Sequence, residues 1–335
     1  MRKAGYTLLI SFICHVVLAQ SAVDKGLQSI NRGTAEAYIA FLASDELEGR
    51  EAGTRGGRIA GEYIISCLKA IGVPAYMESG YSQPFEVLSR KKVITDSIVM
   101  DTDSILRFEK IIPVTLSLNN ILGMIPGRKI DEFVIVGAHY DHLGMDANLH
   151  GDRIYNGADD NASGVSAVLQ IAKAFVESGV KPERNVIFAF WDGEEKRTLG
   201  SNFFVETFRD LSKIKTYMNF DMIGRNTDET QPNHVVYFYT DTHPRYGEWL
   251  KEDIKKHKLA LTPDYRAWDK PVSGSDNASF ARHHIPIIWY HTDGHPDYHK
   301  PSDHFDKLNW GKLIEITKTA YLIMWRLATE DVSPG

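Results

Sequence analysis

Histidines and carboxylates recur along this chain of 335 residues at places where strands are expected to end. Imidazole nitrogens and carboxylate oxygens are ligands that Zn²⁺ accepts in proteins. Two histidines and three carboxylates can hold two adjacent zinc ions if one carboxylate bridges them, and a further acid can then act as a base on a water between the metals. The candidate ligands, in chain order, are His139, Asp159, Glu195, Asp221 and His299. The pattern predicts two Zn²⁺ per chain, with Glu194 as the base.

The first histidine has an acidic neighbour. In VGAHYDH, Asp141 lies two residues after His139, on the same side of an extended chain. A metal-bound histidine usually donates its other ring N–H to a carboxylate, and Asp141 suits that part. A solvated histidine at a polar strand end is an equally good interpretation of this stretch alone. We do not expect His142 to be a ligand.

Two stretches supply the acids. In NGADDNASG, we expect Asp159 to bridge the metals, just before a helix whose free N–H groups orient carboxylates, although a simple helix cap would look the same. In FWDGEEKRTLGS, consecutive acids end an apolar strand, and burying two like charges is unfavourable without a cation nearby. Glu195 as a ligand and Glu194 as a base would resolve that conflict, whereas a solvated loop remains the alternative.

The last candidate ligand, His299, lies in DYHKPSD. Asp303 could be its carboxylate partner, and the Tyr298 phenol could donate to an oxyanion. Taken singly, such His and Tyr residues are more often ordinary loop residues.

Alternating strands and helices would bring these distant stretches together. An α/β fold is expected, with a mostly parallel central sheet and helices on both faces. Ligands of such sheets bind beyond the carboxyl ends of the strands. Four candidate residues fall there, namely His139, Glu194, Glu195 and Asp221, while Asp159 opens a helix. Helices are expected between residues 24 and 73, and short strands of uncertain pairing from 81 to 107. Later strands are expected at 119–127, 132–141, 185–195, 216–224, 234–240 and 285–291, and helices at 164–178, 200–208, 245–259 and 310–328.

The order and wording of these motifs resemble metallopeptidase family 28, which includes dizinc aminopeptidases and glutamate carboxypeptidase II. The resemblance runs from LASDELEGREAGTRGG to YHKPSD, with intervals of 20, 35, 26 and 78 residues between successive motifs. It implies that His139 and Asp221 hold one zinc ion and that Glu195 and His299 hold the other. It also implies a cis peptide between Asp159 and Asp160, and a single zinc-exopeptidase domain over residues 20–335 without a protease-associated insert.

Two other functions on this fold stay open at this point. One is a single-zinc transferase similar to glutaminyl cyclase, and the other is a non-catalytic, receptor-like binding module. The intact ligand set favours the peptidase, and zinc content of two, one or no ions per chain would separate the three. One departure from the family wording is Asn277, which stands in Ser275-Asp276-Asn277 where many members have Ser-Asp-His.

The N-terminal residues, the net charge and the cysteines predict the compartment and the partners of the protein. Residues 1–19 have a basic start, an apolar run and a small-residue exit, which predicts a cleaved signal peptide and a periplasmic or secreted protein. No other segment is expected to cross a bilayer. Cleavage moves the net charge from −6 to −8 and leaves Cys67 as the one cysteine, so nucleic-acid binding and an internal disulfide are not expected.

The expected substrates are peptides with a free N-terminus. An aminopeptidase must recognise the substrate ammonium, and acidic side chains near the metals would do so. Glu46 and Glu48 in DELEGR are candidates, although they could equally be surface charges paired with Arg50 or Arg55.

Overall fold

The computed structural model describes residues 22–98, 105–268 and 274–330, and the side chains of all of these except 91–98 and 105–110. The predicted signal peptide, residues 1–19, lies outside the described residues. Within the described residues, no helix has both the length and the apolar character needed to cross a membrane.

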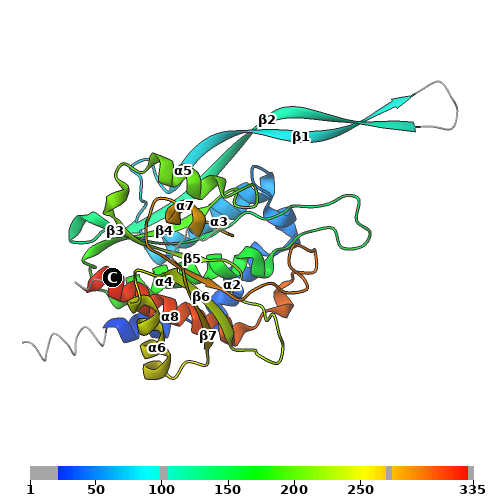
Figure 1. Cartoon of the computed structure of the whole chain (residues 1–335). Helices are drawn as coiled ribbons and strands as arrows, with labels where there is room; N and C mark the ends of the chain where they lie inside the picture. The colour runs from blue at the N-terminus through cyan, green and yellow to red at the C-terminus, as the bar shows by residue number, and fades with distance from the viewer. Residues whose placement is uncertain (1–21, 99–104, 269–273, 331–335) are drawn as a thin grey trace, which may run out of the picture.

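Eight strands form one mixed sheet in the order β1-β2-β4-β3-β5-β8-β6-β7 (Figure 1). The parallel pairs are β3 with β4, β3 with β5, β5 with β8 and β6 with β7, so the predicted parallel centre is confirmed. Antiparallel pairs are β1 with β2, β2 with β4 and β6 with β8. The strands are β1 (Ser82–Ile98), β2 (Ile105–Ile125), β3 (Lys129–His139), β4 (Arg184–Trp191), β5 (Ile214–Phe220), β6 (His234–Thr240), β7 (Thr262–Trp268) and β8 (Ile287–His291).

Helices cover both faces of the sheet because its central strands are apolar on both sides. On β3, Val134 and Val136 join one core, while Ile135 between them joins the core on the other face. The first face carries α2 (Arg32–Leu42), α3 (Arg55–Ile71), α4 (Gly164–Ser178), α6 (Arg245–His257) and α8 (Trp310–Thr329). The second carries α5 (Leu199–Thr207) and α7 (Asn277–Ala281). Asn309 caps α8 as expected, since its side chain accepts the Lys312 N–H at 3.2 Å.

A long antiparallel ribbon replaces the short strands expected from 81 to 107. β1 pairs along its whole length with residues 105–121 of β2, and the ribbon projects from the body of the molecule (Figure 1). Its inner end is anchored where Phe85 and Leu118 pack with Ala52. The last residues of β2 then pair with β4, which joins the ribbon to the central sheet.

The sheet brings the candidate site residues to one edge. The parallel strands β3, β4, β5 and β8 end at His139, Trp191, Phe220 and His291. Neighbouring parallel strands have their carboxyl ends on the same side, so the segments that leave these strands meet there.

Candidate metal centre

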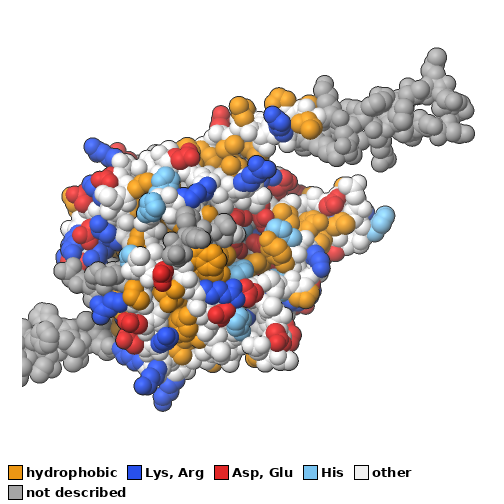
Figure 2. Space-filling view, viewed as in Figure 1, with side chains coloured by type: hydrophobic (Ala, Val, Ile, Leu, Met, Phe, Trp, Pro, Cys, Tyr) orange, Lys and Arg blue, Asp and Glu red, His pale blue; other side chains and the backbone are white. Residues whose placement is uncertain are grey.

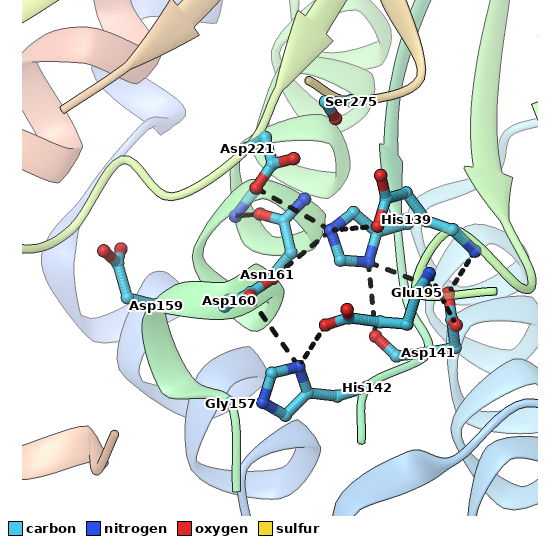
Figure 3. A network of polar contacts seen from close by, with 12 residues as sticks. His139, Asp141, His142, Gly157, Asp159, Asp160, Asn161, Glu195, Asp221 and Ser275 are labelled. Carbon is cyan, nitrogen blue, oxygen red and sulfur yellow. Dashed lines mark hydrogen bonds and ion pairs between the residues drawn. The ribbon is translucent and has the colours of Figure 1, made fainter. Parts of the chain in front are cut away.

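His139 is the last residue of β3 and is almost fully buried. Its Nε2 atom lies 3.3 Å from Oδ1 of Asp160 and 3.7 Å from Oδ1 of Asp221. Its Nδ1 atom instead lies 3.2 Å from the carbonyl oxygen of Asp141. The ring therefore directs one nitrogen toward two carboxylates and uses the other to fix its orientation (Figure 3).

His299 faces the same carboxylate from the other side. Its Nε2 atom lies 3.2 Å from Oδ2 of Asp160 and 3.3 Å from Oε2 of Glu195. Two atoms bound to one tetrahedral zinc ion at about 2.0–2.2 Å are separated by about 3.3–3.6 Å. The distances among these side chains therefore fit two zinc positions, with one oxygen of Asp160 directed to each.

Asp160, and not Asp159, occupies the place between the histidines. The Asp159 side chain points away from the cluster (Figure 3), with Oδ1 accepting the Gly224 N–H at 2.5 Å and Oδ2 lying 3.3 Å from Nε2 of His295. The expectation for Asp159 is thus corrected by one residue, because consecutive residues of this turn project in opposite directions. The cis peptide bond also lies one residue later than expected, between Asp160 and Asn161.

Asp303 anchors the turn that carries Asp160. Its buried Oδ2 atom accepts the N–H groups of Asp159 and Asp160 at 3.0 and 3.1 Å, and its carbonyl oxygen accepts the Ala158 N–H at 3.1 Å. Asp303 was expected to be the partner of His299. The structure places it behind the turn Ala158–Ser163 instead, where it fixes the backbone of the candidate bridging residue.

Asp141 orients both glutamates. Its Oδ1 atom accepts the Glu194 N–H at 3.0 Å, and its Oδ2 atom accepts the Glu195 N–H at 3.4 Å. Its Oδ1 atom lies 3.7 Å from Nδ1 of His139, beyond hydrogen-bond distance, so the ring bonds to the carbonyl oxygen of Asp141 and not to the carboxylate that the sequence suggested. One buried carboxylate thus links the end of β3 to the acidic turn after β4.

His142 is a functional candidate that the sequence interpretation set aside. Its Nδ1 atom lies 2.7 Å from Oε1 of Glu195, a hydrogen-bond distance that is shorter than the edge of a zinc tetrahedron. This contact leaves Oε2 of Glu195 free to face His299. The second histidine of HYDH was the available signal, but its partner Glu195 lies 53 residues away in the chain.

The charges in the cluster shift one another's pKa values. Burial lowers the pKa of His299, but Asp160 and Glu195 raise it more, to about 10. Burial also acts to lower the pKa of His139. Glu194 and the carboxylates of Asp141, Asp160 and Asp221 nevertheless hold it well above the usual range. Burial acts to raise the pKa of Asp160, but the surrounding histidines hold it well below its usual range. The cluster therefore favours positive charge at its centre.

Glu194 differs from its neighbour Glu195. Burial, together with the nearby carboxylates Asp276, Asp221 and Glu195, raises the pKa of Glu194 well above its usual range, although His139 opposes this. By contrast, contacts with His142 and His299 lower the pKa of Glu195 despite burial. A carboxylate of raised pKa is a stronger base, so the two adjacent acids are suited to different parts.

A pocket of about 320 Å³ opens beside the cluster. Figure 2 shows acidic, histidine and apolar side chains around a hollow near the middle of the visible face. The pocket is lined by Asp160, Glu194, Asp221, Met222, Gly274, Trp289, His291, Gly294, Tyr298 and His299. Charged groups thus meet an apolar wall in one concave site, which is the usual composition of a small-molecule or peptide-end site.

Tyr298 stands at the rim of this pocket. Its ring stacks on His299 with the centroids 3.8 Å apart, and 43% of the residue is exposed. Burial of the hydroxyl and the neighbouring carboxylates raise the pKa of Tyr298 further above its usual value, so the phenol stays protonated and can donate a hydrogen bond.

The structure brings together five of the predicted metal and base residues: His139, Glu194, Glu195, Asp221 and His299. Two other sequence candidates lie elsewhere, since Glu46 and Glu48 are exposed on the short helix η1 (Asp45–Arg50) and do not line the described pocket. Asn277 is buried at the start of α7.

Comparison with known proteins adds independent findings. A sequence profile described as Peptidase family M28 matches residues 120–324. Leupeptin-inactivating enzyme 1 of Streptomyces exfoliatus is 28% identical over 170 residues, which cover 50% of this chain and 34% of that protein. A probable leucine aminopeptidase of Arthroderma otae is 28% identical over 218 residues, which cover 62% of this chain and 57% of that protein. The chain thus spans about a third to three fifths of the length of these curated relatives.

The fold is also shared with a solved structure. The structure of BSAP, a zinc aminopeptidase from Bacillus subtilis, superimposes with a TM-score of 0.71 at 14% sequence identity, covering 91% of this chain and 97% of that one. At this identity the likeness concerns the arrangement of strands and helices.

Proposed function

This chain belongs to peptidase family M28, and from that premise we propose that it is an exported, zinc-dependent aminopeptidase with two zinc ions per chain. One observation carries the proposal: the two carboxylate oxygens of Asp160 lie 3.3 and 3.2 Å from the Nε2 atoms of His139 and His299. A carboxylate shared in this way between two histidines is what a bridging ligand requires.

In the proposed centre, His139 and Asp221 would hold one zinc ion, and His299 and Glu195 would hold the other. Asp160 would be shared between them. His142 is a hydrogen-bond partner of Glu195, and Asp303 fixes the backbone behind Asp160. When bound, two zinc ions supply Lewis-acid polarisation of a carbonyl and a lowered pKa of water.

The chain's own residues would move the protons and place the substrate. Glu194, with its raised pKa, takes the proton from the attacking water and returns it to the leaving amine. Tyr298 donates its phenolic hydrogen to the oxyanion that forms at the scissile carbonyl. The pocket wall of Met222 and Trp289 receives the side chain of the residue that is removed.

Export and aminopeptidase specificity have separate support. The predicted signal peptide, residues 1–19, supports a periplasmic or secreted location. The name of the Arthroderma relative supports removal of N-terminal residues from peptides, and the compact pocket next to the metal cluster suits one terminal residue.

The test uses the purified protein, metal analysis and paired peptides. We expect two zinc ions per chain, release of the first residue from a leucyl peptide, and no release after the same peptide is N-acetylated, because an acidic site then lacks its ammonium partner. Cleavage of the blocked peptide at a similar rate, or at internal bonds, would exclude the aminopeptidase proposal. One zinc ion per chain would favour a cyclase-like transferase, and none a binding module.

A further inference from the structure

The DELEGR segment, which the proposed mechanism leaves without a role, ends in a buried arginine. Arg50 is 1% exposed. Its guanidinium donates five hydrogen bonds, all to backbone carbonyl oxygens. Nε donates to Tyr140 at 2.9 Å, Nη1 to Leu42 and Asn156 at 2.6 and 2.5 Å, and Nη2 to Gly157 and Asp160 at 3.1 and 3.4 Å. All the donors of a planar, rigid group are used.

Four of these five carbonyl groups belong to the segments that carry candidate metal ligands. Tyr140 follows His139 directly at the end of β3. Asn156 and Gly157 lead into the turn of Asp160, and Asp160 is the candidate bridge itself. One side chain therefore ties two stretches together that are otherwise connected by a loop of about 15 residues.

The backbone of the segment is shaped to turn Arg50 inward. Glu48, Gly49 and Arg50 have consecutive positive φ angles of 51, 69 and 50°. Gly49 permits close approach, because a Cβ atom there would lie 2.1 Å from the carbonyl oxygen of Gly144. The Gly144 N–H in turn donates to the carbonyl oxygen of Gly49 at 3.0 Å. Left-handed geometry at non-glycine residues is unfavourable and concentrates at functional sites.

The buried positive charge of Arg50 is compensated by its surroundings. Burying a cation is costly unless it is compensated, and five carbonyl dipoles together with nearby carboxylates compensate it. Burial lowers the pKa of Arg50 to about 10, with Asp160, Asp141 and Asp303 opposing the shift. The group stays positive at neutral pH, so a permanent cation lies behind the acidic cluster.

We propose that Arg50 is a positioning residue for the metal centre: it fixes the end of β3 relative to the Asp160 turn, so that His139 and Asp160 lie at zinc-binding distance. This inference rests on the proposed zinc-binding function. It goes beyond that function by assigning a part to a side chain that contacts neither metal nor substrate.

The test compares Arg50→Lys with Arg184→Lys. Arg184 is also buried, and its Nη1 donates to the carbonyl oxygens of Leu327 and Glu330 at 2.8 Å, but it lies at the opposite end of β4 from the cluster. The readouts are the zinc dissociation constant from chelator competition, the melting temperature with and without zinc, and kcat and KM. Loss of a group that orients metal ligands typically weakens metal binding about 10–100-fold. We expect that loss for Arg50→Lys and less than about threefold for Arg184→Lys.

Each outcome decides the matter. A folded Arg50→Lys protein with wild-type zinc affinity and wild-type kcat/KM would overturn the proposal. An Arg50→Lys protein that stays unfolded in saturating zinc, while Arg184→Lys folds, would also overturn it, because Arg50 would then be needed for folding. Added guanidinium ion should restore zinc affinity to Arg50→Ala, and no restoration would also count against it. Wild-type protein that binds no zinc would end the zinc proposal and this one together.

Discussion

The side chain of Asp303 holds the backbone of Asp160, because its buried Oδ2 atom accepts the Asp160 N–H at 3.1 Å. The Asp160 side chain points the other way, toward His139 and His299. Asp303 follows His299 by four residues in the same segment. One short stretch of chain therefore contributes a candidate ligand and also fixes the backbone of the candidate bridge.

Replacing Asp303 by Ala should weaken zinc binding about 10–100-fold, because the Asp160 turn loses its anchor and two buried N–H groups lose their acceptor. Chelator competition measures this. Asp253→Ala is the control, because Asp253 is also buried but accepts hydrogen bonds from Arg326, on α8. Equal zinc affinities for the two variants would contradict the anchoring role.

Asp160→Asn and Asp159→Asn should behave very differently. Asp160→Asn removes the charge between both histidines, so bound zinc should fall well below two ions per chain and turnover should fall by at least about 100-fold. Asp159→Asn alters a side chain that faces Gly224 and His295, so its zinc content should stay at the wild-type value. Metal analysis of both purified variants checks this. Retention of two ions by Asp160→Asn with loss in Asp159→Asn would restore the original assignment.

Glu194→Gln should keep its zinc and lose turnover. The amide has nearly the same shape but cannot accept a proton, and general-base catalysis typically contributes about 10²–10⁴-fold. Zinc content and kcat are measured on the same sample, so that loss of metal is separated from loss of the base. Near wild-type kcat with metal present would exclude Glu194 as the base.

Much of the fold could be predicted because apolar runs bounded by polar turns mark buried strands and helices. The runs at β3, β4, β5 and β8 are of this kind, and the expected helix over residues 164–178 coincides with α4. β7 was not predicted, since Thr262–Trp268 is a partly exposed edge strand with mixed polarity. The length of the β1–β2 ribbon depends on pairing between two segments, which local alternation does not specify.

The structure brings the candidate base and four of the five candidate ligands together, with Asp160 in the place expected for Asp159. The contact of His142 with Glu195 was not expected. Glu194 and Glu195 could be identified because a buried strand rarely ends in two acids without a cation. Asp159 and Asp160 are chemically identical neighbours, and the turn conformation alone decides which of them faces the histidines. Arg50 was considered only as a possible partner of Glu46 or Glu48, since no local pattern reveals that its guanidinium is enclosed by carbonyl groups from three segments of the chain.

Zinc binding should release protons near neutral pH. The pKa of His299 is about 10 and that of His139 lies well above its usual range, so both rings carry protons before zinc enters and must lose one each to bind it. Affinity should therefore rise with pH, by about tenfold per pH unit for each proton released. Calorimetric titrations in buffers of different ionisation enthalpy count the protons. A binding enthalpy that is independent of the buffer would contradict this.

Asp192 should make stability depend on pH in a predictable direction. Burial and the nearby Asp141 raise its pKa from 3.8 to about 7, although the Asn119 N–H donates to Oδ2 at 2.9 Å. The folded protein then binds this proton more tightly than the unfolded chain, so the contribution is fully present below about pH 4 and is lost as the pH rises through about 7. Asp192→Asn carries no such charge and should lose less stability over that range.

The measurement is the melting temperature of wild type and Asp192→Asn from pH 4 to pH 8, both after chelator treatment so that metal binding does not contribute. The difference between the two proteins should shift in favour of Asp192→Asn as the pH rises. Asp210→Asn is the control, because hydrogen bonds from Ser212 lower the pKa of the exposed Asp210 and give a pH dependence of opposite sign. A difference that stays constant across the range would show that Asp192 is ionised in the folded protein throughout.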